Sequence, residues 1–114
     1  MPHFCFMIVN GLKWRVVFTN DPKDLIVDGS VRLGVTDRNK LTVYLSDTLT
    51  GGMLEKVLLH ELTHVWLFSY GYDLDRETEE LISTFVGEHG SELQSRLDIC
   101  LCESVYGSYR HLCC

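Results

Sequence analysis

The sequence has no long apolar run, and it has only two prolines among its 114 residues. No window approaches the roughly 18 consecutive apolar residues that a membrane-spanning helix needs. Residues 1–9 are apolar but short, and they lack the basic start and the small-residue cleavage site of a signal peptide, so we interpret them as a strand. We therefore expect a protein that neither spans a membrane nor is exported, and that works in the cytoplasm.

Positive charge is also scarce. Lys and Arg number 10 against 16 Asp and Glu, which gives a formal net charge of −6 at pH 7. Because no run of Lys or Arg exceeds two residues, nucleic acids and anionic membrane surfaces are not expected partners. The length and the 46% hydrophobic content instead predict one globular domain over residues 1–114.

The cysteines do not form the pattern of a secreted, disulfide-bonded domain. Their number is odd, and four of the five lie in the last 15 residues. A secreted framework usually spreads an even number along the chain, so we expect reduced thiols. The C-x₂-C spacing of a zinc ribbon is absent, and the sequence assigns no role to any of them: Cys5, Cys100, Cys102, Cys113 and Cys114.

The first half of the chain carries strand signals. The apolar run 4–9 and the β-branched and aromatic run 13–19 flank Asn10-Gly11, which is a strong two-residue hairpin turn. A second hairpin is expected between residues 31–36 and 41–46, because the latter alternates apolar and polar residues.

The second half has helical periodicity. Apolar residues recur at helical spacing from residue 53 to about residue 70, and Gly71 is a plausible C-cap. A second helix is expected from Asp75, and the segment 88–90 should end or kink it, with residues 91 to about 103 forming a third helix. The chain therefore predicts an α+β fold, with a small antiparallel or mixed sheet followed by two to three helices. The expected apolar stripe of the second helix is Leu81, Ile82, Phe85 and Val86.

Residues 60–64 read His-Glu-Leu-Thr-His, the pattern H-E-x-x-H. On a helix, His60 and His64 lie on one face about one turn apart, so both imidazoles can bind one Zn²⁺. Glu61 emerges beside the first ligand, where it can take a proton from metal-bound water and pass it to the leaving amine. The alternative is a surface helix whose two histidines only meet solvent, but the apolar residues before the motif favour burial. Unpartnered burial of these side chains would be costly, and a metal removes that cost.

A catalytic zinc site needs a third protein ligand. The metzincin extension is absent, because Leu67 and Tyr70 stand at the relevant positions. A glutamate of the following helix is therefore expected. Helix geometry places Glu79 at the edge of the inward face and Glu80 nearly opposite, so Glu79 is the expected ligand and Glu80 the alternative. The four candidates are Glu77, Glu79, Glu80 and Glu88, and an acidic first turn that only complements the helix dipole is the other interpretation.

Three segments carry a resemblance to a known family: 60–67 (HELTHVWL), 70–72 (YGY) and 79–86 (EELISTFV). Together they resemble the glutamate-ligand zincins, or gluzincins, and more closely the small phage- and prophage-encoded metallopeptidases of the ImmA/IrrE pattern. The resemblance covers residues 31 to about 90. It implies a minimal zincin-like fold in which His60, His64 and Glu79 bind zinc and Glu61 is the general base. It also implies that the strand 41–46 borders the cleft and pairs with an extended peptide.

These observations predict a zinc-dependent metalloendopeptidase that hydrolyses peptide bonds of a peptide or protein substrate. Two alternatives stay open: a non-catalytic binding module stabilised by zinc, and an enzyme autoinhibited by Cys5 or by Cys113-Cys114. Substrate, cleavage preference, pathway and oligomeric state are not determined by the sequence. Further interpretations concern four side chains: Thr63 and Ser83 could orient the ligands, His89 could face substrate or belong to the core, and Trp66 is expected in the core.

Overall fold

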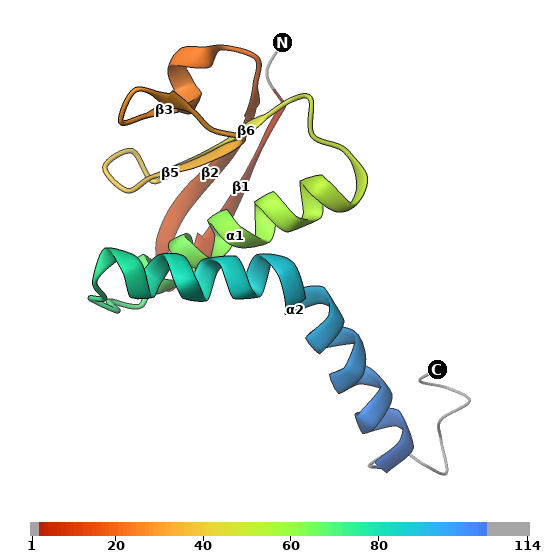
Figure 1. The fold of residues 1–114 in the computed structure, drawn as a ribbon. Coiled ribbons are helices and arrows are strands. Elements are labelled where there is room, and N and C mark those ends of the chain that lie inside the picture. The colour runs from red at the N-terminus through yellow and green to blue at the C-terminus, as the bar shows by residue number, and fades with distance from the viewer. Residues whose placement is uncertain (1–2, 105–114) are drawn as a thin grey trace.

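The computed structural model describes residues 3–104, which form a small mixed β-sheet and two α-helices (Figure 1). The expected α+β class is confirmed. Neither helix in this part of the chain is long and apolar enough to cross a membrane. In chain order the elements are β1 (His3–Val9), β2 (Leu12–Thr19), the short 3₁₀ helix η1 (Pro22–Leu25), β3 (Ile26–Val27), β4 (Ser30–Val31), β5 (Gly34–Asp37), β6 (Thr42–Ser46), α1 (Gly51–Ser69) and α2 (Arg76–Ser104).

The first hairpin forms as expected. β1 and β2 pair antiparallel, with Val9 opposite Leu12 across the Asn10-Gly11 turn. Both turn residues have positive φ, 46° and 81°, as the tight turn that matches strand twist requires. The Asn10 side chain then donates a hydrogen bond to the Ser69 carbonyl oxygen at 2.9 Å, which fixes the hairpin tip to the end of α1.

The second hairpin forms over a shorter stretch than the sequence predicts. β5 and β6 pair antiparallel from Gly34–Asp37 to Thr42–Ser46. Val31 is not part of it, because it pairs with Ile26 in the separate two-stranded sheet of β3 and β4. The turn of that small hairpin is Asp28-Gly29, with φ of 52° and 80°. Asp-Gly is a common hairpin turn, and the sequence interpretation missed it.

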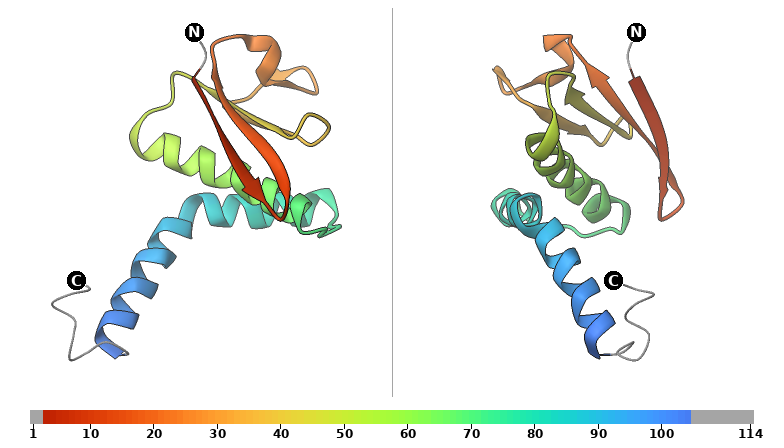
Figure 2. Two further views of the ribbon diagram at one scale, coloured as in Figure 1. Left: turned by 180° about the vertical axis from the view of Figure 1, so that it is seen from behind. Right: turned by 90° about the vertical axis from the view of Figure 1, so that its right-hand side faces the viewer.

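The sheet order is β1-β2-β6-β5, with β2 and β6 parallel and the other pairs antiparallel. α1 packs on one face of this sheet, and α2 lies on the side of α1 away from the sheet (Figures 1 and 2).

The core between the sheet and α1 is centred on Trp14, whose Nε1 donates a hydrogen bond to Ser69 Oγ at 2.9 Å. The expectation that Trp66 is in the core is wrong, since its side chain is 46% exposed. The buried apolar cluster consists of Val9, Trp14, Val16, Val43, Leu45, Leu49 and Val65.

α2 is one continuous helix that bends and then projects from the body of the molecule (Figures 1 and 2). The expected third helix is therefore the second half of α2, and residues 91–101 of that half are all exposed. The expected apolar stripe is only partly correct, because Leu81 and Phe85 are exposed. Ile82 and Val86 are half-buried, and the buried positions of this part of α2 are Glu79, Ser83 and Gly87. A Cβ at Gly87 would lie 2.9 Å from the Lys56 carbonyl oxygen, so the two helices cross closely there.

Candidate metal centre

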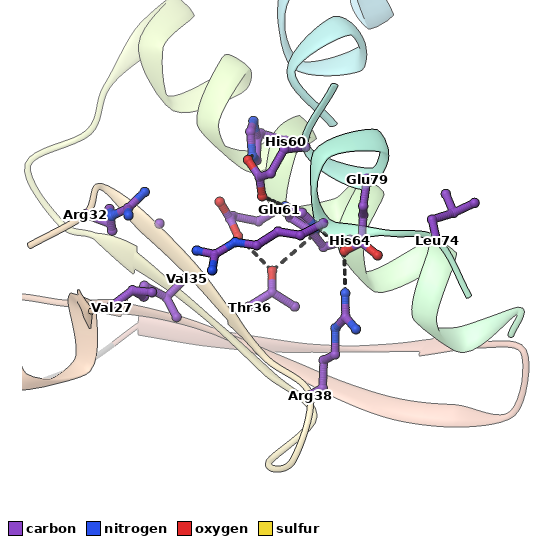
Figure 3. Close-up of a pocket in the computed structure, with 13 residues that line it drawn as sticks. Val27, Arg32, Val35, Thr36, Arg38, His60, Glu61, His64, Leu74 and Glu79 are labelled. Atoms are coloured by element: carbon purple, nitrogen blue, oxygen red, sulfur yellow. Dashed lines mark hydrogen bonds and ion pairs between the residues drawn. The ribbon is translucent and has the colours of Figure 1, made fainter. Parts of the chain in front are cut away.

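α1 presents the three motif residues to one cleft of about 530 Å³ between α1, the start of α2 and β5 (Figure 3). The imidazole rings of His60 and His64 are 5.2 Å apart between centroids, as one turn of helix places them. Both are largely covered, with side chains 26% and 12% exposed. Glu61 is buried between them and the sheet. The expectation that the motif helix is partly buried is therefore confirmed.

Glu61 is positioned by β5. The Thr36 hydroxyl lies 2.8 Å from Glu61 Oε1, to which it donates, and 3.3 Å from the Glu61 carbonyl oxygen. Gly34 makes room for this approach, since a Cβ there would lie 2.9 Å from Glu61 Cγ and 3.2 Å from Oε2. Burial raises the pKa of Glu61, while the Thr36 hydrogen bond and the two histidines oppose that rise. Thr36 therefore fixes Glu61 Oε1. Oε2 is left uncovered on the side of residue 34, because glycine has no side chain there.

Glu79 is buried beneath His64. Its Oε2 accepts a hydrogen bond from His64 Nδ1 at 2.5 Å and a second one from the Arg38 guanidinium, which follows β5 (Figure 3). Burial alone would raise the pKa of Glu79, but the hydrogen bonds from His64 and Arg38, with their charges, together lower it. Glu79 therefore fixes the orientation of the His64 ring, in the way that carboxylates commonly orient metal-binding histidines.

Glu80 faces the other edge of both rings. Its Oε1 lies 3.0 Å from His64 Nε2, and its Oε2 lies 3.3 Å from His60 Nε2. One ligand atom from each of the three residues can be chosen so that all lie within 4.8 Å of one another. The Glu80 side chain is about half exposed, as expected for a residue on the solvent side of the helix. Its carboxylate nevertheless reaches the two histidines.

The geometry therefore favours the alternative third ligand, Glu80, over Glu79. The sequence interpretation centred the inward face of α2 on its large apolar residues. The expected inward position of Glu79 and outward position of Glu80 are confirmed, but the buried Glu79 carboxylate is taken up by His64 Nδ1 and Arg38. Glu80 then stands beside the paired Nε2 atoms.

Two imidazole nitrogens and a carboxylate are a donor set that could hold a divalent metal ion. The His64 ring lies between two carboxylates, with Nδ1 2.5 Å from Glu79 Oε2 and Nε2 3.0 Å from Glu80 Oε1.

Other residues singled out in the sequence lie elsewhere. Thr63 donates to the Leu59 carbonyl oxygen of its own helix at 2.8 Å, so it orients no ligand. Ser83 is fully buried, and its hydroxyl has no hydrogen-bond partner within residues 3–104. His89 is exposed beside the Phe85 ring rather than on the inward face. Glu88 lies 3.5 Å from Lys56 Nζ, outside the cluster.

The cysteines within the described range do not join this cluster. Cys5 lies on β1, the strand at the opposite edge of the sheet from β5, so the expected alternative of inhibition by Cys5 is not supported. Cys5 and Cys100 are exposed, and Cys102 is buried. Cys113 and Cys114 lie outside the described residues.

The strand beside the cleft is not the one that the sequence predicts. Residues 41–46 correspond to β6, which is hydrogen-bonded to β2 on one side and to β5 on the other, so its expected role as an edge is wrong. β5 is the edge strand, and its residues line the cleft. Sequence reasoning missed Gly34, Thr36 and Arg38, since nothing in the local pattern of a four-residue strand marks contacts to helices 25 to 41 residues away.

Comparison with known proteins does not place the chain in a family. A scan against protein-family models finds no match, and neither do searches of curated proteins and of solved structures. Conclusions about function therefore depend on the residues and geometry of the cleft itself.

Proposed function

We propose that the protein is a zinc-dependent peptidase in which His60, His64 and Glu80 bind the metal and Glu61 moves the proton. The observation that carries this proposal is the convergence of His60 Nε2, His64 Nε2 and the Glu80 carboxylate, with Glu61 buried beside them. Glu79 is assigned a positioning role, through its hydrogen bond from His64 Nδ1. The assignment keeps the zincin-like pattern of the motif helix but exchanges the roles of two adjacent glutamates.

A zinc ion held by these residues would act as a Lewis acid, polarising a substrate carbonyl and lowering the pKa of a water molecule. Glu61 supplies the base. Thr36 occupies its Oε1, so Oε2, beside Gly34, takes the proton from the attacking water and delivers it to the leaving amine. A buried carboxylate with a raised pKa is a stronger base than an exposed one, which suits this transfer.

An extended substrate is best accommodated along β5. This strand has an unpaired edge within the four-stranded sheet, and it lines the cleft next to Glu61. A peptide can add to such an edge through main-chain hydrogen bonds. The earlier expectation for residues 41–46 is thus transferred to β5.

The test compares the wild type with Glu61→Gln, which has almost the same shape but cannot accept the proton. We expect both proteins to contain one equivalent of zinc, and the variant to hydrolyse peptides about 10²- to 10⁴-fold more slowly. Glu92→Gln, at an exposed position on the projecting half of α2, is the matched control and should behave as wild type. Equal hydrolysis by the wild type and Glu61→Gln would refute the base role, and purified protein that takes up no metal would refute the site.

A second candidate is a non-catalytic module that zinc stabilises. It is favoured by one observation: the three ligands come from two helices, so a shared ion would join α2 to α1. If that is the sole role of the metal, chelation should unfold the protein and no peptide should be hydrolysed. For the enzyme, chelation should abolish hydrolysis while circular dichroism retains the sheet and α1.

A further inference from the structure

Arginine is concentrated in the cleft of an otherwise acidic protein. The chain has six arginines and four lysines, and three of those arginines line the cleft while none of the lysines does. Arginine is the side chain best suited to planar, two-point binding of a carboxylate. The three residues are Arg32, Arg38 and Arg76.

The balance of charge in the cleft suggests what they bind. The carboxylates that line it are Glu61, Glu79 and Glu80, so three negative charges stand against three guanidinium groups. A divalent ion bound between the histidines and Glu80 would leave an excess of two positive charges, with both histidines neutral. The loaded cleft would therefore attract anionic groups, although the whole protein is acidic.

The three arginines differ in how far they are already engaged. Arg38 is committed to Glu79. Within residues 3–104, the one ion pair of Arg76 is with Asp28, at 3.3 Å, and both side chains are more than two-thirds exposed, so this pair is weak in water. Arg32 has no carboxylate within ion-pair distance in residues 3–104, while its backbone N–H is fixed by a 2.8 Å hydrogen bond to the Leu25 carbonyl oxygen. In the view of Figure 3, Arg32 and Arg38 lie on opposite sides of Glu61.

We propose that the cleft selects peptides that carry a carboxylate close to the scissile bond, and that Arg32 is the main residue that binds it, with Arg76 assisting. This inference rests on the proposed peptidase function and specifies its substrate class. The carboxylate has two possible sources, an Asp or Glu side chain and the free C-terminus of a peptide. Both present the same planar group to a guanidinium.

Binding is measured first, without turnover, on zinc-loaded Glu61→Gln. The probes are fluorescently labelled peptides of one alanine-rich core, with Glu, Gln or Lys placed in turn at each position around the central bond, each as the free acid and as the C-terminal amide. Fluorescence anisotropy gives the dissociation constants. We expect at least one Glu peptide to bind about tenfold more tightly than its Gln counterpart, and about 0.5 M NaCl to reduce that preference. A preference that follows the free acid rather than the Glu side chain assigns the C-terminus as the source.

Arg32→Glu in the same background should remove this preference and leave the affinity for the Gln amide peptide within about twofold. Arg96→Glu makes the same change of charge on the exposed, projecting half of α2 and should retain the preference. Equal affinity for Glu, Gln and amidated peptides, or loss of the preference in Arg96→Glu as well, would overturn the inference.

Hydrolysis of the same peptides by the wild type separates this inference from the proposed function. If neutral and acidic peptides are cleaved equally well, the protein is a peptidase but the arginines do not select its substrate. If acidic peptides bind through Arg32 but none is cleaved, the carboxylate site stands and the peptidase function fails.

Discussion

α1 and α2 contribute to the same cleft but are held in different ways. α1 lies between the sheet and α2, with Val65 and Glu61 buried, and its last residue accepts hydrogen bonds from both Asn10 and Trp14. α2 packs on α1 along its first half, with a further hydrogen bond from Ser91 to Glu55, and residues 91–101 are exposed. The imidazoles of His60 and His64 are therefore held by a helix that is packed on two sides. The positions of the Glu79 and Glu80 carboxylates depend on how α2 crosses α1. Each change below tests that difference.

The largest effect on zinc affinity is expected from a substitution on α1. His64→Ala removes a proposed ligand and also leaves the buried Glu79 without one of its hydrogen-bond partners. Zinc affinity should fall by more than the roughly 10- to 100-fold that loss of a ligand's supporting partner causes. Competition with a chromophoric chelator measures this, and His89→Ala on the exposed face of α2 is the control. Unchanged zinc affinity in His64→Ala would show that the metal binds elsewhere.

The two glutamates of α2 should give unequal effects. Glu80→Gln weakens a proposed ligand, so zinc affinity should fall by about 100-fold or more. Glu79→Gln only removes the charge that orients His64, and a decrease of about tenfold is expected. The same chelator competition decides between them. The reverse order of effects would restore Glu79 as the ligand and make Glu80 a surface residue.

The roles of Glu79 and Glu80 could not be predicted from the sequence, whereas other parts of the site could. His60, Glu61 and His64 share one helical face whatever surrounds them, so their grouping follows from local geometry. The same is true of the Asn10-Gly11 hairpin, which needs only its own backbone conformation. Which glutamate faces the imidazoles depends on how α2 rotates and crosses α1. The two helices cross closely at Gly87, a contact that the search for an apolar stripe ignored.

Gly87→Ala tests the crossing directly. Its new Cβ would lie 2.9 Å from the Lys56 carbonyl oxygen and 3.3 Å from His60 Cβ, so α2 must move away from α1. We expect a net loss of about 1–3 kcal/mol in the free energy of unfolding, despite the better helix propensity of alanine, and a weaker zinc site.

Gly90→Ala, one turn later, is the matched control. There the new Cβ meets only side-chain atoms of Val86 and Leu59, at 3.2 Å or more, and these can shift. Chemical denaturation and zinc titration of both variants measure the difference. If Gly87→Ala were as stable as Gly90→Ala and bound zinc normally, the close crossing would not determine the site.

The smallest effect concerns the starts of the two helices. Asp75 caps α2, since its Oδ1 accepts a 2.7 Å hydrogen bond from the Thr78 N–H, whereas the Thr50 side chain makes no capping hydrogen bond to α1. Asp75→Ala should therefore lower the melting temperature by a few degrees, and Thr50→Ala should change it less.

The effect of Asp75→Ala on the melting temperature must also depend on pH. The hydrogen bonds from Thr78 lower the pKa of Asp75 below its ordinary value of 3.8, so folding favours the ionised form. The stabilisation is complete above that ordinary value and is lost as pH falls through the lowered one. Melting curves of the metal-free wild type and Asp75→Ala should accordingly differ at neutral pH and converge in acid. A difference that persisted in acid would mean that Asp75 acts on α2 through something other than its charge.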